Sequence, residues 1–295
     1  MAKNKKNILI TGGAGFIAKN ISEHLKDNYK VTIIDIKELD LLDPVKVFSF
    51  LKSNKFDTII HAANYDASTK FTANNPEKVL ENNLKMFFNI VRCKDCFKKM
   101  IYFGSGAEFG RENWAPKMKE SDSDKNIATD QYGFSKHVMT KYVQLSERIY
   151  NLRLFGVFGK YEDWRYRFIS NTCCRVISNM PIIINQNRFF DYLHVDDLAR
   201  VVKWFIDNKP KNNIYNVCTG KSNDLKTLAE KIIKISGKKI KIEIKEKKLG
   251  KEYSGDNALL MGELSGFKFS SIDDKIRELY DYYDLNKSII RKEDL

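Results

Sequence analysis

Three side chains in the sequence have the types and the spacing needed to move a proton near neutral pH. Tyr132 and Lys136 lie four residues apart in the segment YGFSK, so on a helix the phenol and the ammonium would share one face. Ser105 ends the apolar run MIYFGS, where a hydroxyl can project from the end of a strand. We therefore predict that Ser105, Tyr132 and Lys136 are catalytic, with Ser105 holding a substrate oxygen beside the Tyr132 hydroxyl. Gly104 and Gly106 would leave room for the substrate to approach.

A glycine-rich turn lies between the first apolar run and the first helical pattern, in the segment ILITGGAGFIAKNISEHL. Gly12 allows a tight turn, Gly15 lets a pyrophosphate approach the backbone, and Ala18 is small enough for close packing of helix on strand. The N-terminus of the helix that follows would face the anion. The turn therefore predicts a dinucleotide site. The cofactor contacts expected here are Gly12, Gly15, Phe16 and Ile17.

An aspartate at the end of the second apolar run bears on the choice of cofactor. Asp35 can accept hydrogen bonds from both ribose hydroxyls and would repel a 2′-phosphate, so it favours NAD(H). Lys37 tempers that preference, and NADP(H) is not excluded. We expect Asp40 and Leu41 to border the adenine, although a helix cap at Asp43 explains part of the same stretch.

The proposed proton transfer requires a change in the pKa of Tyr132. Free tyrosine titrates near 10, and lowering this pKa by roughly 3 units requires about 4 kcal/mol of preference for the phenolate. Lys136 and the positive nicotinamide ring can supply that field in a closed cleft. We therefore expect a lowered pKa for Tyr132 in the working enzyme.

Short apolar runs and amphipathic segments alternate through the first half of the chain. This alternation predicts an α/β fold with a Rossmann-type, doubly wound parallel sheet, whose ligands bind at the carboxyl ends of the strands. The expected strands are 7–11, 30–35, 57–62, 100–105 and 151–156, and the expected helices are 15–27, 44–53, 76–97 and 130–148.

The pattern becomes irregular after residue 156 and predicts a smaller, interleaved C-terminal lobe. A strand followed by a helix is expected in YLHVDDLARVVKWFIDN, a strand in NIYNVCTG, a helix followed by a strand within 223–248, and a last helix at 271–283. We expect the dinucleotide-binding domain to comprise 1–155 with a returning segment at about 189–218. The substrate lobe would comprise 156–188 and 219–295.

Composition excludes several classes of protein. The 295 residues carry a formal charge of +13, but the lysines are spread through nearly every segment, so we expect no nucleic-acid partner. The longest apolar runs fall far short of a membrane span, and the lysine-rich start enters a strand directly, so we expect a cytoplasmic protein that does not bind membranes. Five cysteines and four histidines form no ligand cluster, and we expect no metal site.

Together, these motifs resemble the extended short-chain dehydrogenase/reductases of the NAD-dependent epimerase/dehydratase family, which act on nucleotide-diphosphate sugars. The resemblance extends over almost the whole chain, because FFDYLHVDDLARVV and YNVCTG look like the later landmarks of that family. It implies a homodimer that pairs the helices at 76–97 and 130–148. It also implies that Lys136 binds the nicotinamide ribose. Further cofactor contacts implied by the resemblance are Ala62, Ala63 and Asn82.

The two phosphates of such a substrate need cationic partners. Arg188 is the main candidate, because a guanidinium can bind phosphate through two parallel hydrogen bonds. Lys160, Arg165 and Arg167 are offered by the segment KYEDWRYRFISN, and solvated surface charge is the alternative for all four residues. The full set of expected substrate contacts is Ser105, Gly106, Tyr132, Arg165 and Arg188.

Departures from the family pattern narrow the choice among the possible reactions. Dehydration is disfavoured because Ser105 is followed by Gly106 and Ala107, where 4,6-dehydratases have an Asp-Glu pair. Gly156 stands where many epimerases have asparagine, whereas the stretch ELDLLDPVKVFSFLKSNKFDTIIHAA resembles GDP-fucose synthase and related 4-keto-sugar reductases. We therefore predict a 4-keto-sugar reductase. The alternatives are a 4-epimerase or a 4-dehydrogenase with tightly bound NAD, and a non-catalytic dinucleotide-binding regulatory protein.

Overall fold

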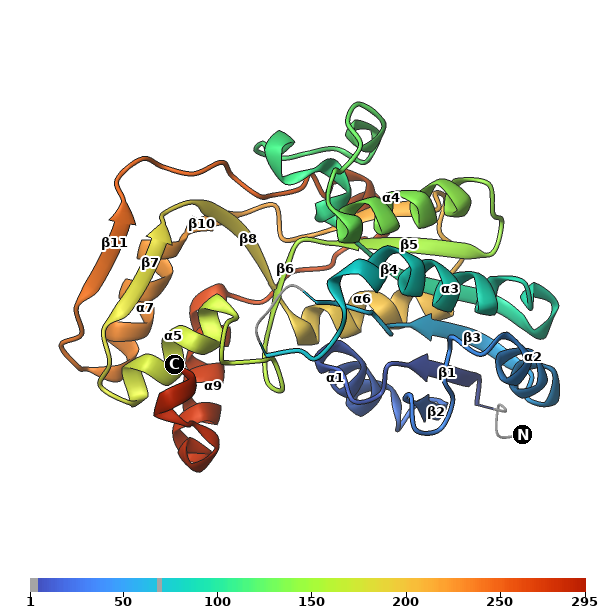
Figure 1. Ribbon diagram of the computed structural model, residues 1–295, viewed down its shortest axis with the longest axis horizontal. Coiled ribbons are helices and arrows are strands. Elements are labelled where there is room, and N and C mark those ends of the chain that lie inside the picture. The colour runs from blue at the N-terminus through green and yellow to red at the C-terminus, as the bar shows by residue number, and fades with distance from the viewer. Residues whose placement is uncertain (1–4, 68–70) are drawn as a thin grey trace.

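A six-stranded parallel sheet forms the centre of the molecule in the computed structural model, which describes residues 5–67 and 71–295 (Figure 1). The strand order is β2-β1-β3-β4-β5-β9, and every neighbouring pair is parallel. The strands are β1 (Asn7–Thr11), β2 (Lys30–Ile34), β3 (Phe56–His61), β4 (Phe97–Ser105), β5 (Ile149–Leu154) and β9 (Ile214–Val217). The order in which the strands are added reverses between β1 and β3. In open α/β sheets, ligands bind at such a point.

Helices cover both faces of this sheet, because side chains along each strand alternate between the faces. In β1, Ile8 and Ile10 belong to the core that includes α1 and α6, and Leu9 belongs to the core that includes α2, α3 and α4. These helices are α1 (Phe16–Leu25), α2 (Pro44–Ser53), α3 (Val79–Val91), α4 (Gln131–Gln144) and α6 (Val195–Asp207). The predicted doubly wound α/β fold is confirmed. Within residues 5–67 and 71–295, no helix is long and apolar enough to cross a membrane.

Most of the remaining elements lie beside the sheet (Figure 1) and contribute to a second hydrophobic core. One three-stranded sheet joins β6 (Gly156–Phe158), β8 (Phe189–His194) and β10 (Ser222–Asp224), and β7 (Ile182–Gln186) pairs with β11 (Ile242–Glu246). The helices of this second core are α5 (Phe168–Ile177), α7 (Leu225–Ser236) and α9 (Ile272–Leu285), whereas α8 (Ala258–Glu263) packs through Leu260 on the core of the central sheet. The sequence pattern did not predict α5, α8, β6, β7 or β10.

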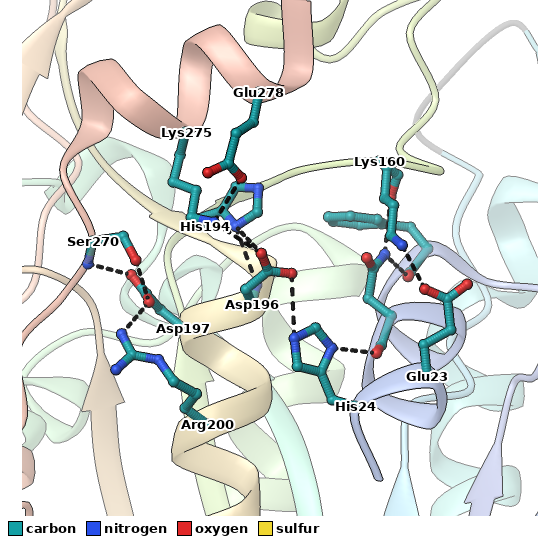
Figure 2. Close-up of polar contacts among 12 residues, drawn as sticks. Glu23, His24, Lys160, His194, Asp196, Asp197, Arg200, Ser270, Lys275 and Glu278 are labelled. Atoms are coloured by element: carbon teal, nitrogen blue, oxygen red, sulfur yellow. Dashed lines mark hydrogen bonds and ion pairs between the residues drawn. The ribbon is translucent and has the colours of Figure 1, made fainter. Parts of the chain in front are cut away.

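The N-terminus of α6 connects elements from both parts of the chain, as Figure 2 shows. Asp196 accepts a hydrogen bond of 3.1 Å from Lys275 of α9, and its other carboxylate oxygen lies 3.5 Å from Nε2 of His24 on α1. Asp197 accepts hydrogen bonds of 2.8 Å from the backbone N–H and from the hydroxyl of Ser270. These contacts fix the start of α9 against the N-terminal end of α6.

Candidate active site

The sequence-predicted catalytic residues meet in one cleft of about 1130 Å³ at the carboxyl edge of the central sheet. Elements from both halves of the chain contribute to its walls, from the start of α1 to β7 and β8. The predicted residues that line it are Phe16, Ile17, Ala62, Ala63, Ser105, Tyr132, Lys136 and Arg188. Residues that are far apart in the sequence therefore share one solvent-accessible space.

Ser105 is held at the end of β4 by a short 3-10 helix, η3 (Gly106–Phe109). The Ser105 hydroxyl oxygen accepts a hydrogen bond of 3.1 Å from the backbone N–H of Ala107. The backbone N–H of Ser105 donates to Oε1 of Glu108 at 3.2 Å, which completes a capping box. The strand ends here because these reciprocal bonds turn the chain, and the hydroxyl stays at the cleft.

A buried ion pair stabilises this turn. Glu108 and Arg153 are both fully buried, and Nε and Nη2 of Arg153 donate to Oε2 of Glu108 at 3.1 and 2.9 Å. Arg153 also donates to the side chain of Asn216 at 3.1 Å. The segment carrying Ser105 is therefore linked to β5 and β9.

Tyr132 and Lys136 project from the first turns of α4, whose N-terminus is capped by Asp130. Asp130 accepts a hydrogen bond of 2.9 Å from the backbone N–H of Gly133. The ammonium of Lys136 donates to the carbonyl of Phe103 at 3.1 Å and lies 5.5 Å from the centre of the Tyr132 ring. Burial lowers the pKa of Lys136 to about 8.

The pKa of Tyr132 differs from the value expected from the sequence. Burial raises the pKa of Tyr132 to about 12, and its hydrogen bond with Ser105 and the positive charge of Arg167 oppose this increase only in part. The phenol is therefore protonated at neutral pH in this structure. The expected lowering depended on a positive nicotinamide ring as well as on Lys136, and it stays a prediction for the complex with the oxidised cofactor.

The glycine turn has the geometry that a dinucleotide requires. Gly12 has φ +73°, and a Cβ atom there would lie 2.7 Å from the backbone of Ala63 on the next loop. Gly15 is the N-cap of α1, and within the described residues no side chain bonds to this helix end. Phe16 and Ile17 begin the helix and line the cleft. The open N-terminus of α1 thus fits a pyrophosphate.

The residues expected around the ribose and the adenine lie beyond the cleft lining, on the turn after β2. Asp35 is half-buried, and its backbone N–H donates to Glu38 at 2.8 Å. Asp40 accepts a hydrogen bond of 2.9 Å from the backbone N–H of Leu42, so one carboxylate oxygen is engaged within the turn. Leu41 is buried in the core with α2 and α3. The turn and the core therefore explain in part why an aspartate and a leucine occupy positions 40 and 41, apart from any contact with the cofactor.

Asn83, the neighbour of the expected cofactor contact Asn82, shapes the loop that follows β3. The buried positions of α3 are Val79, Asn83, Phe87, Ile90 and Val91. The Asn83 side chain accepts a hydrogen bond of 2.9 Å from the backbone N–H of Tyr65 and donates to the carbonyl of Tyr65 at 2.8 Å. Asn82 lies one position away from this buried face. The helical period of the apolar positions is the signal that identifies Asn83.

The arginines proposed for the diphosphate occupy two different places. Arg188 lines the cleft and donates to Gln186 at 2.6 Å. Arg165 instead lines a separate cavity of about 500 Å³, where its guanidinium donates to Asp163 at 2.7 Å. The structure therefore does not bring Arg165 to the cleft that contains Ser105. Arg167, which the sequence offered only as a weaker candidate, does line this cleft.

The two glycines beside Ser105 make room for protein side chains. A Cβ atom on Gly104 would lie 2.2 Å from Asn151 and 2.6 Å from Glu108, and one on Gly106 would lie 2.6 Å from the hydroxyl of Tyr253. The sequence predicts that these glycines leave room for a substrate. The structure instead shows that the space next to each of them is occupied by the buried network and by Tyr253.

Two titratable residues of the cleft, Tyr253 and Glu162, were not identified from the sequence. Tyr253 lies next to Gly106, and no local pattern could link it to Ser105 because it comes from a distant, irregular segment. Glu162 is buried and accepts a hydrogen bond of 2.7 Å from the Ser170 hydroxyl. Burial raises the pKa of Glu162 to about 7.

The chain is similar in sequence and in fold to enzymes of nucleotide-sugar metabolism. ADP-L-glycero-D-manno-heptose-6-epimerase of Brachyspira hyodysenteriae is 26% identical over 258 residues, which cover 76% of this chain and 79% of the relative. The fold is similar to that of a GDP-mannoheptose C4 reductase from Campylobacter jejuni with NADP bound, with a TM-score of 0.82, 19% identity and coverage of 96% of this chain and 99% of that one. A UDP-glucose 4-epimerase from Thermus thermophilus in complex with NAD gives a TM-score of 0.77, 21% identity and coverage of 94% and 98%.

The match to a family model agrees with these similarities. Residues 8–218 match the model described as the NAD dependent epimerase/dehydratase family. The matched part begins in β1 and ends after β9, so it includes the glycine turn, Ser105, Tyr132 and Lys136. The chain belongs to the NAD dependent epimerase/dehydratase family.

Proposed function

We propose that this protein is an NAD(P)-dependent oxidoreductase that reduces the keto group at carbon 4 of a nucleotide-diphosphate sugar. The observation that carries the proposal is the convergence of Ser105, Tyr132 and Lys136 in one cleft beside the glycine turn. When bound, the reduced nicotinamide supplies the hydride. The side chains of the protein hold the substrate and supply the proton.

Each catalytic residue has a role that follows from its surroundings. Tyr132 is protonated at neutral pH because burial raises its pKa to about 12, so it can give a proton to the keto oxygen as the carbon is reduced. Ser105 holds the same oxygen. Lys136, which contacts the Tyr132 ring and the carbonyl of Phe103, provides positive charge for the phenolate that remains and binds the nicotinamide ribose.

The proposed binding residues form two groups, one for the cofactor and one for the substrate. On the cofactor side we propose Gly12, Gly15, Phe16, Ile17, Asp35, Asp40, Leu41, Ala62, Ala63, Asn82 and Lys136. On the substrate side, Arg188 binds the diphosphate, and Ser105 and Tyr132 contact the sugar. Gly106 is left out of this proposal because Tyr253 occupies the space beside it. Arg165 belongs to this proposal only if the separate cavity that it lines also accommodates part of the substrate. NAD(H) is the proposed cofactor because of Asp35.

Epimerisation at carbon 4 is the second candidate. It is supported by the fold similarity to a UDP-glucose 4-epimerase that binds NAD, the cofactor that Asp35 favours. Reduction is preferred because Gly156 replaces the asparagine expected in many epimerases, and a GDP-mannoheptose C4 reductase also has a similar fold, with a TM-score of 0.82. A regulatory role without catalysis is disfavoured by the presence of the whole Ser-Tyr-Lys group.

We also propose a cytoplasmic homodimer built through α3 and α4. These helices lie side by side on one face of the sheet, and Phe88 of α3 makes an edge-to-face contact with Tyr142 of α4, with ring centres 5.3 Å apart (Figure 1). Such partly buried aromatic residues would be covered in a helix-to-helix interface. Sedimentation velocity at several protein concentrations tests this assembly.

The first experiment identifies any small molecule released when freshly purified protein is denatured, by ultraviolet spectrum and mass. Stoichiometric NAD⁺ or NADH would favour an epimerase or an internally recycling 4-dehydrogenase. A protein without a retained cofactor that binds added NADH or NADPH would favour a reductase that exchanges its cofactor in every cycle.

The second experiment replaces Tyr132 by Phe and follows oxidation of NADH and of NADPH in the presence of a panel of nucleotide-linked 4-keto sugars. Loss of the proton donor should lower kcat by about 10²- to 10⁴-fold and leave cofactor binding intact. Tyr161→Phe is the matched control, because the Tyr161 hydroxyl bonds to Glu23 at 2.8 Å outside the cleft. An unchanged rate for Tyr132→Phe would contradict the assignment of Tyr132 as the acid.

A further inference from the structure

Lys136 is a buried cation whose charge is compensated only in part by oxygen atoms. Only 4% of the residue is exposed. Among residues 5–67 and 71–295, its ammonium donates one hydrogen bond, to the carbonyl of Phe103 at 3.1 Å, and forms no ion pair. An ammonium has three N–H donors, so two of them have no acceptor within these residues. Other groups must therefore contribute to the stability of the charge.

Two aromatic rings lie against this ammonium. Nζ of Lys136 is 4.9 Å from the centre of the Tyr102 ring and 5.5 Å from the centre of the Tyr132 ring. Both distances are within about 6 Å, where the negative face of a ring attracts a cation. The attraction is larger in the interior than at the surface, because no water competes for the charge. The shorter distance is to Tyr102, which the proposed reaction does not use.

The ring of Tyr102 is held in place by the central sheet and one of its helices. The residue lies on β4, three positions before Ser105, and is 1% exposed. Its ring makes an edge contact with Phe87 of α3, with ring centres 5.1 Å apart, and stacks on His61 of β3 at 6.1 Å. A ring that is packed in this way has little freedom to move away from the ammonium.

The hydroxyl of Tyr102 does not explain why an aromatic residue occupies this position. It is buried, and within the described part of the chain it has no hydrogen-bond partner. Burial raises the pKa of Tyr102 well above its usual value, so the group is uncharged. The face of the ring is therefore the part of Tyr102 that can act on Lys136.

The other titratable groups around Lys136 act in both directions. Burial lowers the pKa of Lys136 to about 8, whereas the carboxylates of Glu108 and Asp66 raise it. His61 adds no positive charge, because burial, aided by the charge of Lys136, lowers the pKa of His61 to about 3. The phenol of Tyr132 is protonated at neutral pH, because burial raises its pKa to about 12. A modest attraction by a ring therefore decides how much of Lys136 stays charged.

We propose that Tyr102 is a positioning residue whose ring face binds the Lys136 ammonium and keeps it charged beside Tyr132. The consequence for catalysis rests on the proposed function, because the charge of Lys136 stabilises the phenolate that remains after Tyr132 has given up its proton. If the Lys136 pKa fell from about 8 to about 7, the charged fraction at pH 7 would drop from about nine-tenths to about a half.

The test measures the pKa of Lys136 in the protein without added ligand, by NMR with ¹³C at the ε-carbon of lysine. The Lys136 signal is the one that is missing from Lys136→Met. The native chain is compared with Tyr102→Phe, with Tyr102→Leu and with a series that carries phenylalanine with one, two or three ring fluorines at position 102. Fluorine withdraws electrons from the ring face and hardly changes the shape of the side chain, so the series separates attraction from packing.

Tyr150→Leu is the matched control. Tyr150 is a buried tyrosine on the neighbouring strand β5, and its ring centre lies 5.7 Å from the ammonium of a different lysine, Lys99. This variant removes a similar ring from the core and leaves the surroundings of Lys136 in place.

The expected results follow from the charge on the ring face. Tyr102→Phe keeps the ring and leaves the Lys136 pKa unchanged. Tyr102→Leu removes the ring and lowers the Lys136 pKa by about one pH unit. In the fluorinated series, the Lys136 pKa falls in steps as fluorine atoms are added. Tyr150→Leu leaves it unchanged.

Three outcomes would overturn the proposal. An unchanged Lys136 pKa in Tyr102→Leu would show that the ring does not stabilise the charge. Equal falls in Tyr102→Phe and Tyr102→Leu would assign the effect to the hydroxyl. A fall in Tyr102→Leu without a trend across the fluorinated series would show that Tyr102 acts only by packing. If Tyr102→Leu does not fold, the fluorinated series decides alone, because a graded fall supports the proposal and a flat series contradicts it.

Turnover separates this proposal from the proposed function. If Tyr132→Phe retains full turnover with nucleotide-linked 4-keto sugars, the proposed function fails, whereas the Lys136 pKa still reports on the ring of Tyr102. If Tyr132→Phe is inactive but the Lys136 pKa does not follow the fluorinated series, only the role of Tyr102 fails.

Discussion

A single carboxylate, that of Asp35, is expected to decide between the two nicotinamide cofactors. The residue ends the run of β2 and is half-buried, with its backbone bonded to Glu38 at 2.8 Å. Asp35→Asn removes the charge that repels a 2′-phosphate and keeps the size of the side chain. We expect the ratio of the dissociation constants for NADP⁺ and NAD⁺ to fall about tenfold, which corresponds to about 1.4 kcal/mol. Isothermal titration calorimetry with both cofactors measures it.

The matched control for this prediction is Asp40→Asn. One Asp40 oxygen already accepts a hydrogen bond from Leu42 within the turn, so its replacement should leave the ratio of the two dissociation constants unchanged. If Asp35→Asn left the ratio unchanged as well, the preference would have to be set elsewhere.

The buried pair of Glu108 and Arg153 should be one of the most sensitive points for stability. Both side chains are fully buried, and removal of one charge leaves the other unpaired in the interior. We expect Arg153→Met to lower the free energy of unfolding by about 3 to 5 kcal/mol. Urea denaturation followed by circular dichroism measures the change.

A surface pair provides the comparison for Arg153. Lys98 bonds to Asp57 at 2.7 Å, but 82% of its side chain is exposed, so Lys98→Met should cost less than about 1 kcal/mol. Equal losses in the two variants would mean that burial of the Glu108–Arg153 pair has no special effect.

At the scale of elements, α3 positions the loop after β3 through Asn83. The Asn83 side chain satisfies both backbone polar groups of Tyr65, and Ala62 and Ala63 of the same loop line the cleft. Asn83→Ala leaves these two groups without their partner. We expect a loss of about 1 to 3 kcal/mol in the free energy of unfolding and weaker NAD⁺ binding.

Asn82→Ala is the internal control for the loss of stability, because the two asparagines are neighbours in sequence and differ in the face of α3 that they occupy. Thermal unfolding with and without NAD⁺ compares the variants. An equal loss of stability in Asn82→Ala would contradict the role of Asn83 in positioning the loop, whereas a loss of NAD⁺ binding without a loss of stability would support Asn82 as a cofactor contact.

The central sheet could be predicted because each of its strands has a signal in its own residues. Runs such as NILIT and DTIIHA are short, apolar and rich in isoleucine, and helical spacing follows each of them. In α5 (Phe168–Ile177), by contrast, the buried face includes polar Ser170 and Thr172 and the thiols of Cys173 and Cys174, so its sequence pattern was weak. The boundary between the two lobes stays a prediction.

The candidate site was predictable where its residues follow strand ends or share a helix turn. Ser105, Tyr132 and Lys136 meet in the cleft for this reason. Tyr253 could not be predicted because its position depends on how a distant segment packs on β8. Arg165 was expected at the cleft but faces Asp163, since an ion pair between near neighbours is made locally.

At the scale of the whole molecule, two buried groups have opposite effects on stability in acid. Burial, aided by the charge of Lys136, lowers the pKa of His61 from 6.5 to about 3, while burial raises the pKa of Glu162 from 4.5 to about 7. Between pH 4.5 and 6.5 the unfolded chain protonates His61 and the folded chain does not, so acid destabilises the fold. Over the same interval the folded chain protonates Glu162 and the unfolded chain does not, so acid stabilises the fold.

Because the two effects oppose each other, removing either group should make the free energy of unfolding depend on pH, with opposite signs for the two single variants. Between pH 6.5 and pH 5, Glu162→Gln should lose about 1.5 kcal/mol of stability as the pH falls, because the His61 effect is no longer opposed. His61→Gln should gain a similar amount, and the native chain and the double variant should both change little. Urea unfolding at several pH values measures all four slopes. Parallel curves of unfolding free energy against pH would contradict the assignment. A uniform change in stability shifts such a curve without changing its slope, whereas the loss of one titrating group must change the slope.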